Sequence, residues 1–311
     1  MMQRFLGKLL VFWFLFLLGI LGILLLPLPS RGYHLAILDK HRLLDAMGSP
    51  KLVIAGGSNC AFGIDSLALT EALGMQVFNL GISAGFGLGR ILDDAGSFLR
   101  EGDVLLIIPE YSHFTDNWNG SATAYELIFD ARQYRFLLHP GLYGLPGGLP
   151  SHITTHLLGF IAGFRPPNPL AYSRDGFNPY GDYIGHLEME NQAFKSVPAL
   201  GNLDQRALNR FFRFVESCEK QGILVILSYP SYEEASFTAS TELIRTLDGI
   251  LRERIPVISR PETYCFPRDW FYDTVYHLNK EGRRQRTEAL LGDIEQAGLF
   301  PLSPYARTSV P

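Results

Sequence analysis

A serine follows an apolar run and two glycines early in the chain, in an order that suits nucleophilic chemistry. Residues 52–55 are of strand type, Gly56 and Gly57 end the run, and Ser58 opens a segment typical of a helix start. Ligands of open α/β sheets bind beyond the carboxyl ends of the strands, where glycine lets a substrate approach the backbone closely. Ser58 is therefore the candidate nucleophile, with an ordinary turn bearing a surface serine as the alternative. Cys60 fits a small buried side chain better than a second nucleophile.

A serine hydroxyl is a weak nucleophile and needs an adjacent base. His277 is the candidate base, because imidazole changes its charge near neutral pH. Asp273, four residues earlier, is the nearest carboxylate that can orient the imidazole. Backbone N–H groups around Ser58 and in the glycine-rich segment 79–85 are candidates for holding an oxyanion. Taken singly, each residue also has an ordinary structural role in a turn or at a helix start.

Alternating strands and helices predict how these residues come together. The pattern indicates a flavodoxin-like, three-layer α/β/α fold with a mainly parallel five-stranded sheet, whose carboxyl edge gathers the candidate residues. The expected strands are 52–55, 76–79, 103–108, 223–228 and 256–259, and the expected helices are 65–73, 88–100, 203–221, 234–252 and 279–296.

Residues 113–200 interrupt this rhythm with many glycines, prolines and aromatic residues. They are expected to form an insertion over the sheet edge, either a lid or binding loop or a purely structural excursion. Short helices are expected between 122 and 138 and near 153–161. Several aromatic side chains of the insertion are candidates for stacking on sugar rings, although packing is the commoner role: Trp118, Tyr125, Tyr134, Tyr143 and Tyr180.

The amino terminus predicts a membrane anchor. Residues 9–26 are uncharged and apolar, and a helix of that length spans about 27 Å, close to the bilayer core. Arg4 and Lys8 precede the run, so residues 1–8 are expected to be cytoplasmic, 9–29 to be the anchor and 30–50 a connector to an exported domain. A long cleaved signal peptide is the alternative.

The composition excludes several classes of function. The 311 residues carry a net charge of −4, which argues against nucleic acid as the partner. Hydrophobic residues make up 47% of the chain, which excludes a disordered protein. The three cysteines do not suggest a disulfide framework, and no Cys/His grouping with zinc spacing stands out, so no metal site is predicted.

The chain resembles the SGNH (GDSL-like) hydrolase superfamily. The resemblance covers the sheet-forming parts, about 51–111 and 203–298, within a domain expected at 51–300 and followed by a tail at 301–311. Its blocks are Gly57-Ser58-Asn59 with Gly63-Ile64-Asp65-Ser66, then Asn79-Leu80-Gly81-Ile82-Ser83-Ala84-Gly85, and finally Asp273 with His277-Leu278-Asn279 and Gly282.

The resemblance implies that Ser58 is the nucleophile, His277 the base and Asp273 the orienting acid. It implies backbone oxyanion donors at Ser58 and Ala84, and no metal or organic cofactor. Asp273 and His277 are one residue further apart than in the family, which leaves Asp269 as a reserve acid.

The third block departs from the family at its oxyanion-hole asparagine. The chain has Pro109-Glu110-Tyr111 there, so Asn59 is expected to substitute as an oxyanion donor. Glu110 and Tyr111 are candidates for contact with the substrate, and Glu110 donates to an oxyanion only when protonated.

Together these features predict a single-pass protein of the bacterial inner membrane with its domain in the periplasm. The resemblance implies a serine esterase or O-acyltransferase acting on acyl (acetyl) esters of cell-envelope polysaccharide, because membrane-anchored relatives in bacterial envelopes often modify such polysaccharides. The alternative is an inactive scaffold or binding subunit of a polysaccharide-modifying complex, beside a multi-spanning membrane acyltransferase.

Overall fold

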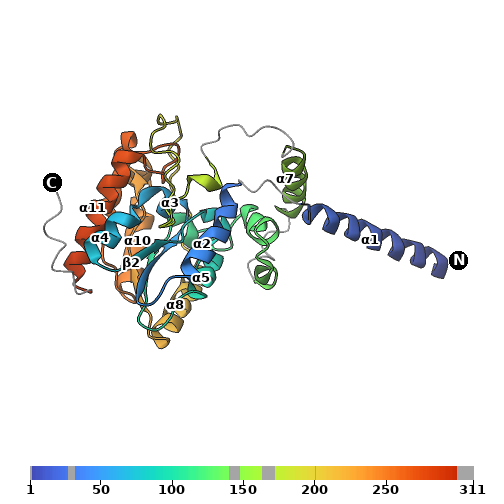
Figure 1. The fold of residues 1–311 in the computed structure, drawn as a ribbon, viewed down its shortest axis with the longest axis horizontal. Helices are drawn as coiled ribbons and strands as arrows, with labels where there is room; N and C mark the ends of the chain where they lie inside the picture. The colour runs from blue at the N-terminus through green and yellow to red at the C-terminus, as the bar shows by residue number, and fades with distance from the viewer. Residues whose placement is uncertain (1, 27–31, 140–147, 163–171, 200, 300–311) are drawn as a thin grey trace.

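A computed structural model describes residues 2–26, 32–139, 148–162, 172–199 and 201–299 (Figure 1). Its centre is a parallel sheet in the order β2-β1-β3-β4, which is the flavodoxin order. The strands are β1 (Lys51–Gly56), β2 (Gln76–Asn79), β3 (Val104–Ile108) and β4 (Leu224–Leu227). Leu52 of β1 lies beside Val77 of β2 and Val104 of β3, so the three carboxyl ends reach the same edge.

The prediction of a fifth strand is wrong in extent. Residues 256–259 form only an isolated parallel bridge, in which Val257 lies opposite Leu227 of β4. Pro256 has no N–H to donate, and Pro261 follows shortly after, so the ladder cannot extend. A separate pair of short parallel strands, β5 (Tyr232–Glu233) and β6 (Cys265–Phe266), was not predicted.

Alternate residues of the strands bury their side chains on opposite faces of the sheet. In β1, Leu52 and Ile54 join one hydrophobic cluster, and Val53 and Ala55 join the other. The first face is covered by α4 (Ser66–Leu73) and α11 (Lys280–Ala297). The second is covered by α2 (Ala36–Asp45), α5 (Leu88–Gly96) and α8 (Gln205–Lys220) (Figure 1).

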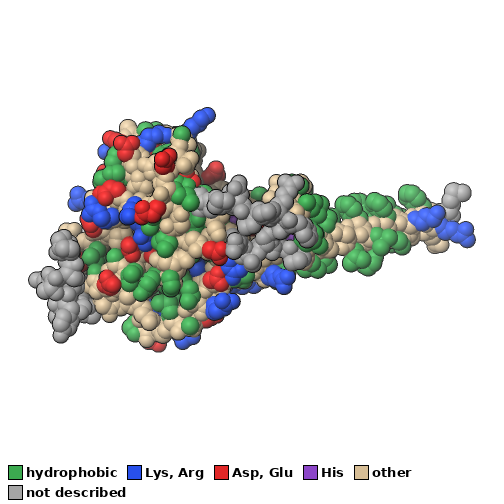
Figure 2. Space-filling model, turned by 45° about the horizontal axis from the view of Figure 1, so that its top comes forward, with side chains coloured by type: hydrophobic (Ala, Val, Ile, Leu, Met, Phe, Trp, Pro, Cys, Tyr) green, Lys and Arg blue, Asp and Glu red, His purple; other side chains and the backbone are tan. Residues whose placement is uncertain are grey.

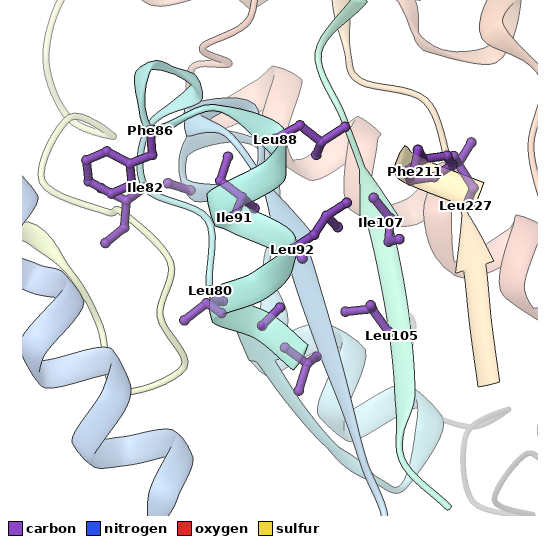
Figure 3. Packing of buried hydrophobic residues seen from close by; sticks show 14 of the residues in the cluster. Leu80, Ile82, Phe86, Leu88, Ile91, Leu92, Leu105, Ile107, Phe211 and Leu227 are labelled. Carbon is purple, nitrogen blue, oxygen red and sulfur yellow. The ribbon is translucent and has the colours of Figure 1, made fainter. Parts of the chain in front are cut away.

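Helix α5 shows how such a face is filled. Leu92 of α5 points toward Leu105 and Ile107 of β3, with Leu227 of β4 beyond them, while Ile91 lies on the other side of α5 (Figure 3). All five side chains are at least nine-tenths buried. This packing fixes β1 and β3, and therefore the edge where Ser58 lies.

The helix expected at 234–252 is divided in two. It forms α9 (Glu234–Ala239) and α10 (Thr241–Arg252). The break falls at Ser240, whose hydroxyl donates to the carbonyl of Ser236 (2.7 Å). Serine side chains compete with backbone hydrogen bonds in this way and favour helix ends.

Helix α1 (Met2–Leu24) is long enough and apolar enough to cross a membrane. It extends away from the domain as a hydrophobic rod (Figure 2). The helix begins at Met2, so the basic residues Arg4 and Lys8 lie in its first two turns.

The insertion contains short helices and one longer one. A helical stretch comprises α6 (Thr123–Tyr125) and η4 (Glu126–Asp130), and η5 (Tyr134–Leu138) follows, as expected between 122 and 138. Helix α7 (Gly148–Ala162) includes the helix expected near 153–161 and packs beside the carboxyl end of α1 (Figure 1). The tail at 301–311 and part of the insertion lie outside the described residues.

Candidate active site

Ser58 is the first residue of α3 (Ser58–Gly63), a short helix that follows β1 directly. Gly57 precedes it, and three chain segments meet there. A Cβ at Gly57 would lie 2.6 Å from Oε1 of Glu110 and 3.0 Å from the backbone nitrogen of Ala84. A side chain does not fit at that spacing, so glycine is what lets the loops after β2 and β3 close around Ser58.

A tight hairpin places His277 and Asp273. The amide of Tyr272 donates to the carbonyl of His277 (2.7 Å), and Phe271 pairs with Leu278 in an antiparallel bridge. The turn between them brings Nδ1 of His277 within 2.8 Å of Oδ1 of Asp273. The turn thus accommodates the four-residue spacing, and Asp273, not Asp269, is the carboxylate that pairs with His277.

The hydroxyl of Tyr172 also contacts this pair. It donates to Oδ2 of Asp273 and lies 3.0 Å from Nδ1 of His277. Burial would raise the pKa of Asp273, but the hydrogen bonds from His277 and Tyr172 outweigh it and lower that pKa below the ordinary value. The carboxylate therefore stays charged and accepts the Nδ1 hydrogen of His277, which leaves Nε2 as the basic nitrogen.

Phe62 connects the histidine to the helix that carries the serine. Its ring stacks on the ring of His277, with centroids 4.1 Å apart and planes inclined by 11°. Ser58 and Phe62 are one helical turn apart on α3, so their Cβ atoms are separated by about 5–6 Å. Within the described chain no hydrogen bond joins Ser58 to His277. Catalytic hydrogen bonds are often longer before substrate binds.

Ala84 offers an N–H group beside Ser58. It begins η2 (Ala84–Phe86), and its N–H has no hydrogen-bond partner among the described residues. Its carbonyl, by contrast, accepts from Nδ2 of Asn117 at 3.0 Å and contacts Nε2 of His113 at 3.4 Å. These contacts hold Ala84 in place and leave its N–H available for a ligand.

His113 is fixed as a neutral residue. Its Nδ1 accepts from the backbone N–H of Glu110 (3.0 Å), so its hydrogen is on Nε2, facing Ala84. Burial lowers its pKa to about 4. His113 therefore links the second and third loops of the site as a structural connector, not as a base.

Glu110 lies against the nucleophile. Burial raises its pKa to about 7, while hydrogen bonds from the backbone N–H of Asn59 and from the Ser58 hydroxyl act in the opposite direction. Its side chain is only 6% exposed. Near neutral pH the carboxyl thus exists in both forms, and the neutral form is a hydrogen-bond donor.

Three residues that the sequence singled out are buried in packing contacts: Asn59, Tyr111 and Cys60. The Asn59 side chain donates to the carbonyl of Ile108 (3.1 Å) and is 5% exposed, so it is not turned toward a substrate as the predicted oxyanion donor would be. Tyr111 is 1% exposed and packs against Tyr232, so it does not meet a substrate from solvent. Cys60 is fully buried, and burial raises the pKa of its thiol to about 12, as fits a packing residue.

The aromatic side chains of the insertion that were candidates for stacking on sugar rings differ in exposure. Trp118 and Tyr125 are buried, whereas Tyr134 is 42% exposed and Tyr180 is half-buried. Tyr143 lies outside the described residues. Tyr172, which contacts His277, was not predicted, because it is more than 100 residues away in sequence and carries no local motif. His113, which helps to hold Ala84 in place, was not predicted either. Its position three residues after Glu110 is the one signal in the sequence that could have indicated it.

We expect Glu110→Gln to remove an alkaline limb from the pH profile. Because the pKa of Glu110 is raised to about 7, the wild-type carboxyl donates below that pH and becomes a charged acceptor above it, where it competes with His277 for the Ser58 hydrogen. The kcat/KM for p-nitrophenyl acetate should therefore fall above about pH 7 in the wild type, whereas glutamine donates at every pH.

Glu110→Ala is the control for this experiment. It removes the donor altogether, so kcat/KM should fall about 100-fold below pH 7, where the wild-type carboxyl donates, and by much less above it, where the wild type has no donor either. An alkaline limb that persists unchanged in Glu110→Gln would contradict the assigned role of Glu110.

No family model and no curated relative matches the chain. Among solved structures, the chain is similar to one described as "a putative lipolytic protein of G-D-S-L family" from Desulfitobacterium hafniense DCB-2. The sequence identity is 12%, the match covers 79% of this chain and 99% of that chain, and the TM-score is 0.39. A likeness at this level assigns no residue, so the candidate site rests on the contacts given above.

Proposed function

We propose that the protein is a membrane-anchored serine esterase or O-acyltransferase that acts on acyl esters of cell-envelope polysaccharide. One observation carries the proposal: the Asp273–His277 pair, joined at 2.8 Å, is stacked on the helix whose first residue is Ser58. A nucleophile, a base and an orienting carboxylate at the carboxyl edge of a parallel sheet suit acyl transfer.

The proposed reaction begins when Oγ of Ser58 attacks the acyl carbonyl. Nε2 of His277 takes the hydroxyl proton, and Asp273 stabilises the imidazolium that results. The N–H groups of Ser58 and Ala84 hold the oxyanion of the tetrahedral intermediate. His277 then returns the proton to the departing alkoxide. Water or a sugar hydroxyl resolves the acyl-enzyme, which gives hydrolysis or transfer.

A cavity beside the Ala84 turn supports a polar substrate. Its volume is about 400 Å³, and every lining residue is polar or glycine: Gly85, Ser112, Asp116, Asn117, Gly120 and Ser121. Such a lining offers hydrogen-bond donors and acceptors to sugar hydroxyls but little apolar surface to a fatty acyl chain.

The location is part of the proposal. Helix α1 is a candidate span with basic residues near its amino end, which favours a cytoplasmic amino terminus and an exported domain. An enzyme held in the inner membrane, with its domain in the periplasm, would meet polysaccharide on its way to the cell surface.

A non-enzymatic scaffold is the second candidate. It is favoured by the lack of a Ser58–His277 hydrogen bond in the described chain and by the Tyr172 hydroxyl against the Asp273–His277 pair. In that case the domain would bind polysaccharide beside a multi-spanning acyltransferase without forming an acyl-enzyme.

Surface glycans of the native host test the function. In a strain lacking the protein, mass spectrometry should show an altered number of acyl groups per repeat. The wild-type chain should restore the pattern, and Ser58→Ala, at equal abundance in the membrane, should not. Full restoration by Ser58→Ala would favour the scaffold, and an unaltered pattern in the deletion strain would contradict a role on polysaccharide.

A further inference from the structure

Three potential metal ligands meet where the insertion contacts the end of α1. Asp130 ends η4, and His152 and His156 are one turn apart on α7, so both imidazoles project from the same face. The ligand atoms of this histidine–aspartate cluster all lie within 4.8 Å of one another. Oδ1 of Asp130 is 2.7 Å from Nδ1 of His156 and 3.3 Å from Nε2 of His152.

The protonation of His156 leaves a lone pair facing the cluster. Its Nε2 lies 3.1 Å from the carbonyl of Leu26, which can only accept a hydrogen bond, so Nε2 carries the hydrogen. In the neutral ring, Nδ1 then presents its lone pair to the carboxylate of Asp130. Two acceptors face each other at 2.7 Å, an arrangement that only a cation or a second ring proton makes favourable.

His152 provides an independent observation. It is 4% exposed, and its Nε2 has no hydrogen-bond partner among the described residues. A buried imidazole nitrogen without a partner is unusual in a native protein. This nitrogen faces the same Asp130 oxygen that Nδ1 of His156 contacts, so both histidines direct a ring nitrogen toward one carboxylate oxygen.

We infer that Asp130, His152 and His156 form a binding site for a divalent transition-metal ion of the zinc class. Zinc prefers imidazole and carboxylate ligands in a tetrahedron with bonds of about 2.0–2.1 Å, which sets ligand atoms about 3.3 Å apart. The Asp130–His152 separation of 3.3 Å fits such an edge, whereas the 2.7 Å between Asp130 and His156 would lengthen by about 0.6 Å when an ion binds. The hydrogen bond from His156 to the Leu26 carbonyl is the outer-shell contact that metal-binding histidines make.

A small cavity adjoins two of the three proposed ligands. Its volume is about 120 Å³, and its lining includes Asp130 and His156 together with Leu24, Leu25 and Leu26 at the end of α1. This volume is large enough for a water ligand, since one water occupies about 30 Å³.

The site would join three parts of the chain. Asp130 comes from η4 and the histidines from α7, and the histidine hydrogen bond reaches the last described residue of the α1 segment. A bound ion would therefore fix the insertion to the end of the membrane helix. This inference does not depend on the proposed enzymatic function.

Metal binding by the full-length chain in detergent is the direct test. After removal of metals with a chelator, equilibrium dialysis against Zn²⁺ should give one ion per chain. Co²⁺ in its place should give the intense visible absorption of a tetrahedral site. Mg²⁺, which prefers six oxygen ligands, should not compete.

Two variants assign the ligands. His152→Gln and Asp130→Asn should each weaken Zn²⁺ binding by at least about 100-fold. His34→Gln is the matched control, because His34 also pairs with a carboxylate near α1, that of Glu126, but lies outside the cluster. It should bind Zn²⁺ like the wild type.

Either of two results would overturn the inference. The first is a wild-type chain that takes up no Zn²⁺ or Co²⁺ at micromolar concentrations, a result that does not depend on the folding of any variant. The second is Zn²⁺ binding equal in wild type, His152→Gln and Asp130→Asn. A further readout is proteolysis between α1 and the domain, which Zn²⁺ should slow in the wild type and leave unchanged in His152→Gln.

Discussion

Ser58→Ala is expected to lose labelling by a fluorophosphonate probe and to lower kcat for p-nitrophenyl acetate by at least about 10⁴-fold. The probe forms a covalent bond only with an activated serine. Of the predicted residues, Ser58 is the one that begins the helix stacked on the Asp273–His277 pair. Removal of the hydroxyl leaves the base and the backbone donors without a nucleophile, so only weak catalysis by the remaining site persists.

Ser112→Ala is the matched control for this experiment. Ser112 lines the polar cavity beside the Ala84 turn, but no hydrogen bond joins its hydroxyl to a histidine or carboxylate among the described residues, so its loss should leave labelling unchanged. Circular dichroism should show that both variants fold as the wild type does. Labelling that persists in Ser58→Ala would remove Ser58 as the nucleophile.

Lys51→Met is expected to lower the free energy of unfolding by about 3–5 kcal/mol. Lys51 begins β1 and Asp103 precedes β3, and their side chains are 1% and 0% exposed. Nζ of Lys51 donates to Oδ2 of Asp103 at 2.7 Å, and the backbone N–H of Lys51 donates to Oδ1 at 3.1 Å. Removing the lysine charge would leave a carboxylate buried without its counter-ion.

The double variant Lys51→Met/Asp103→Asn distinguishes the lost charge pair from lost packing. It removes both charges but keeps an oxygen that accepts from the backbone, so more than half of the stability should return. Urea unfolding of the full-length chain in detergent, followed by tryptophan fluorescence, measures both effects. A double variant as unstable as Lys51→Met would show that packing, not an unpaired charge, dominates.

The pH dependence of this pair has a definite sign. Burial would raise the pKa of Asp103, but hydrogen bonds from Lys51, Ser49 and Arg100 lower it below the ordinary value of 3.8. A carboxylate with a lowered pKa in the folded state stabilises the protein above the unfolded-state pKa. That stabilisation is lost as the pH falls through the lower, folded-state value. The loss should be smaller in Lys51→Met/Asp103→Asn.

Local patterns were sufficient for most of the fold. Apolar runs that end in glycine or polar turns predicted β1 to β4, because strands of a parallel sheet are buried on both faces. The apolar run at the amino terminus predicted α1, because it is long enough to cross a membrane as a helix. The prediction of a full strand at 256–259 was wrong. Pairing depends on the neighbouring strand as well as on the apolar residues of the segment, and Pro256 limits the ladder.

Within the candidate site, the sequence indicated Ser58, Asp273 and His277, because each follows a strand or precedes a helix that places it at one edge of the sheet, whereas Ala84 was indicated only by the resemblance. The sequence left open which carboxylate pairs with His277 and what replaces the missing asparagine. The hairpin turn brings Asp273, and not Asp269, beside His277. Burial raises the pKa of Glu110 to about 7, so its neutral form can donate a hydrogen bond.

The contacts between distant segments could not be read from spacing. Tyr172 reaches Asp273 from the insertion, and Asp130 meets the two histidines of α7 from another helix. The four-residue spacing of His152 and His156 was visible in the sequence, but a helical pair becomes a candidate metal site only when a third ligand faces it. Strand runs and the anchor follow from local apolar patterns, whereas partners, burial and pKa values follow from packing between segments far apart in the chain. The position of Ser58 on its glycine turn therefore follows from the local pattern, whereas the environment proposed to make it reactive follows from packing between distant segments.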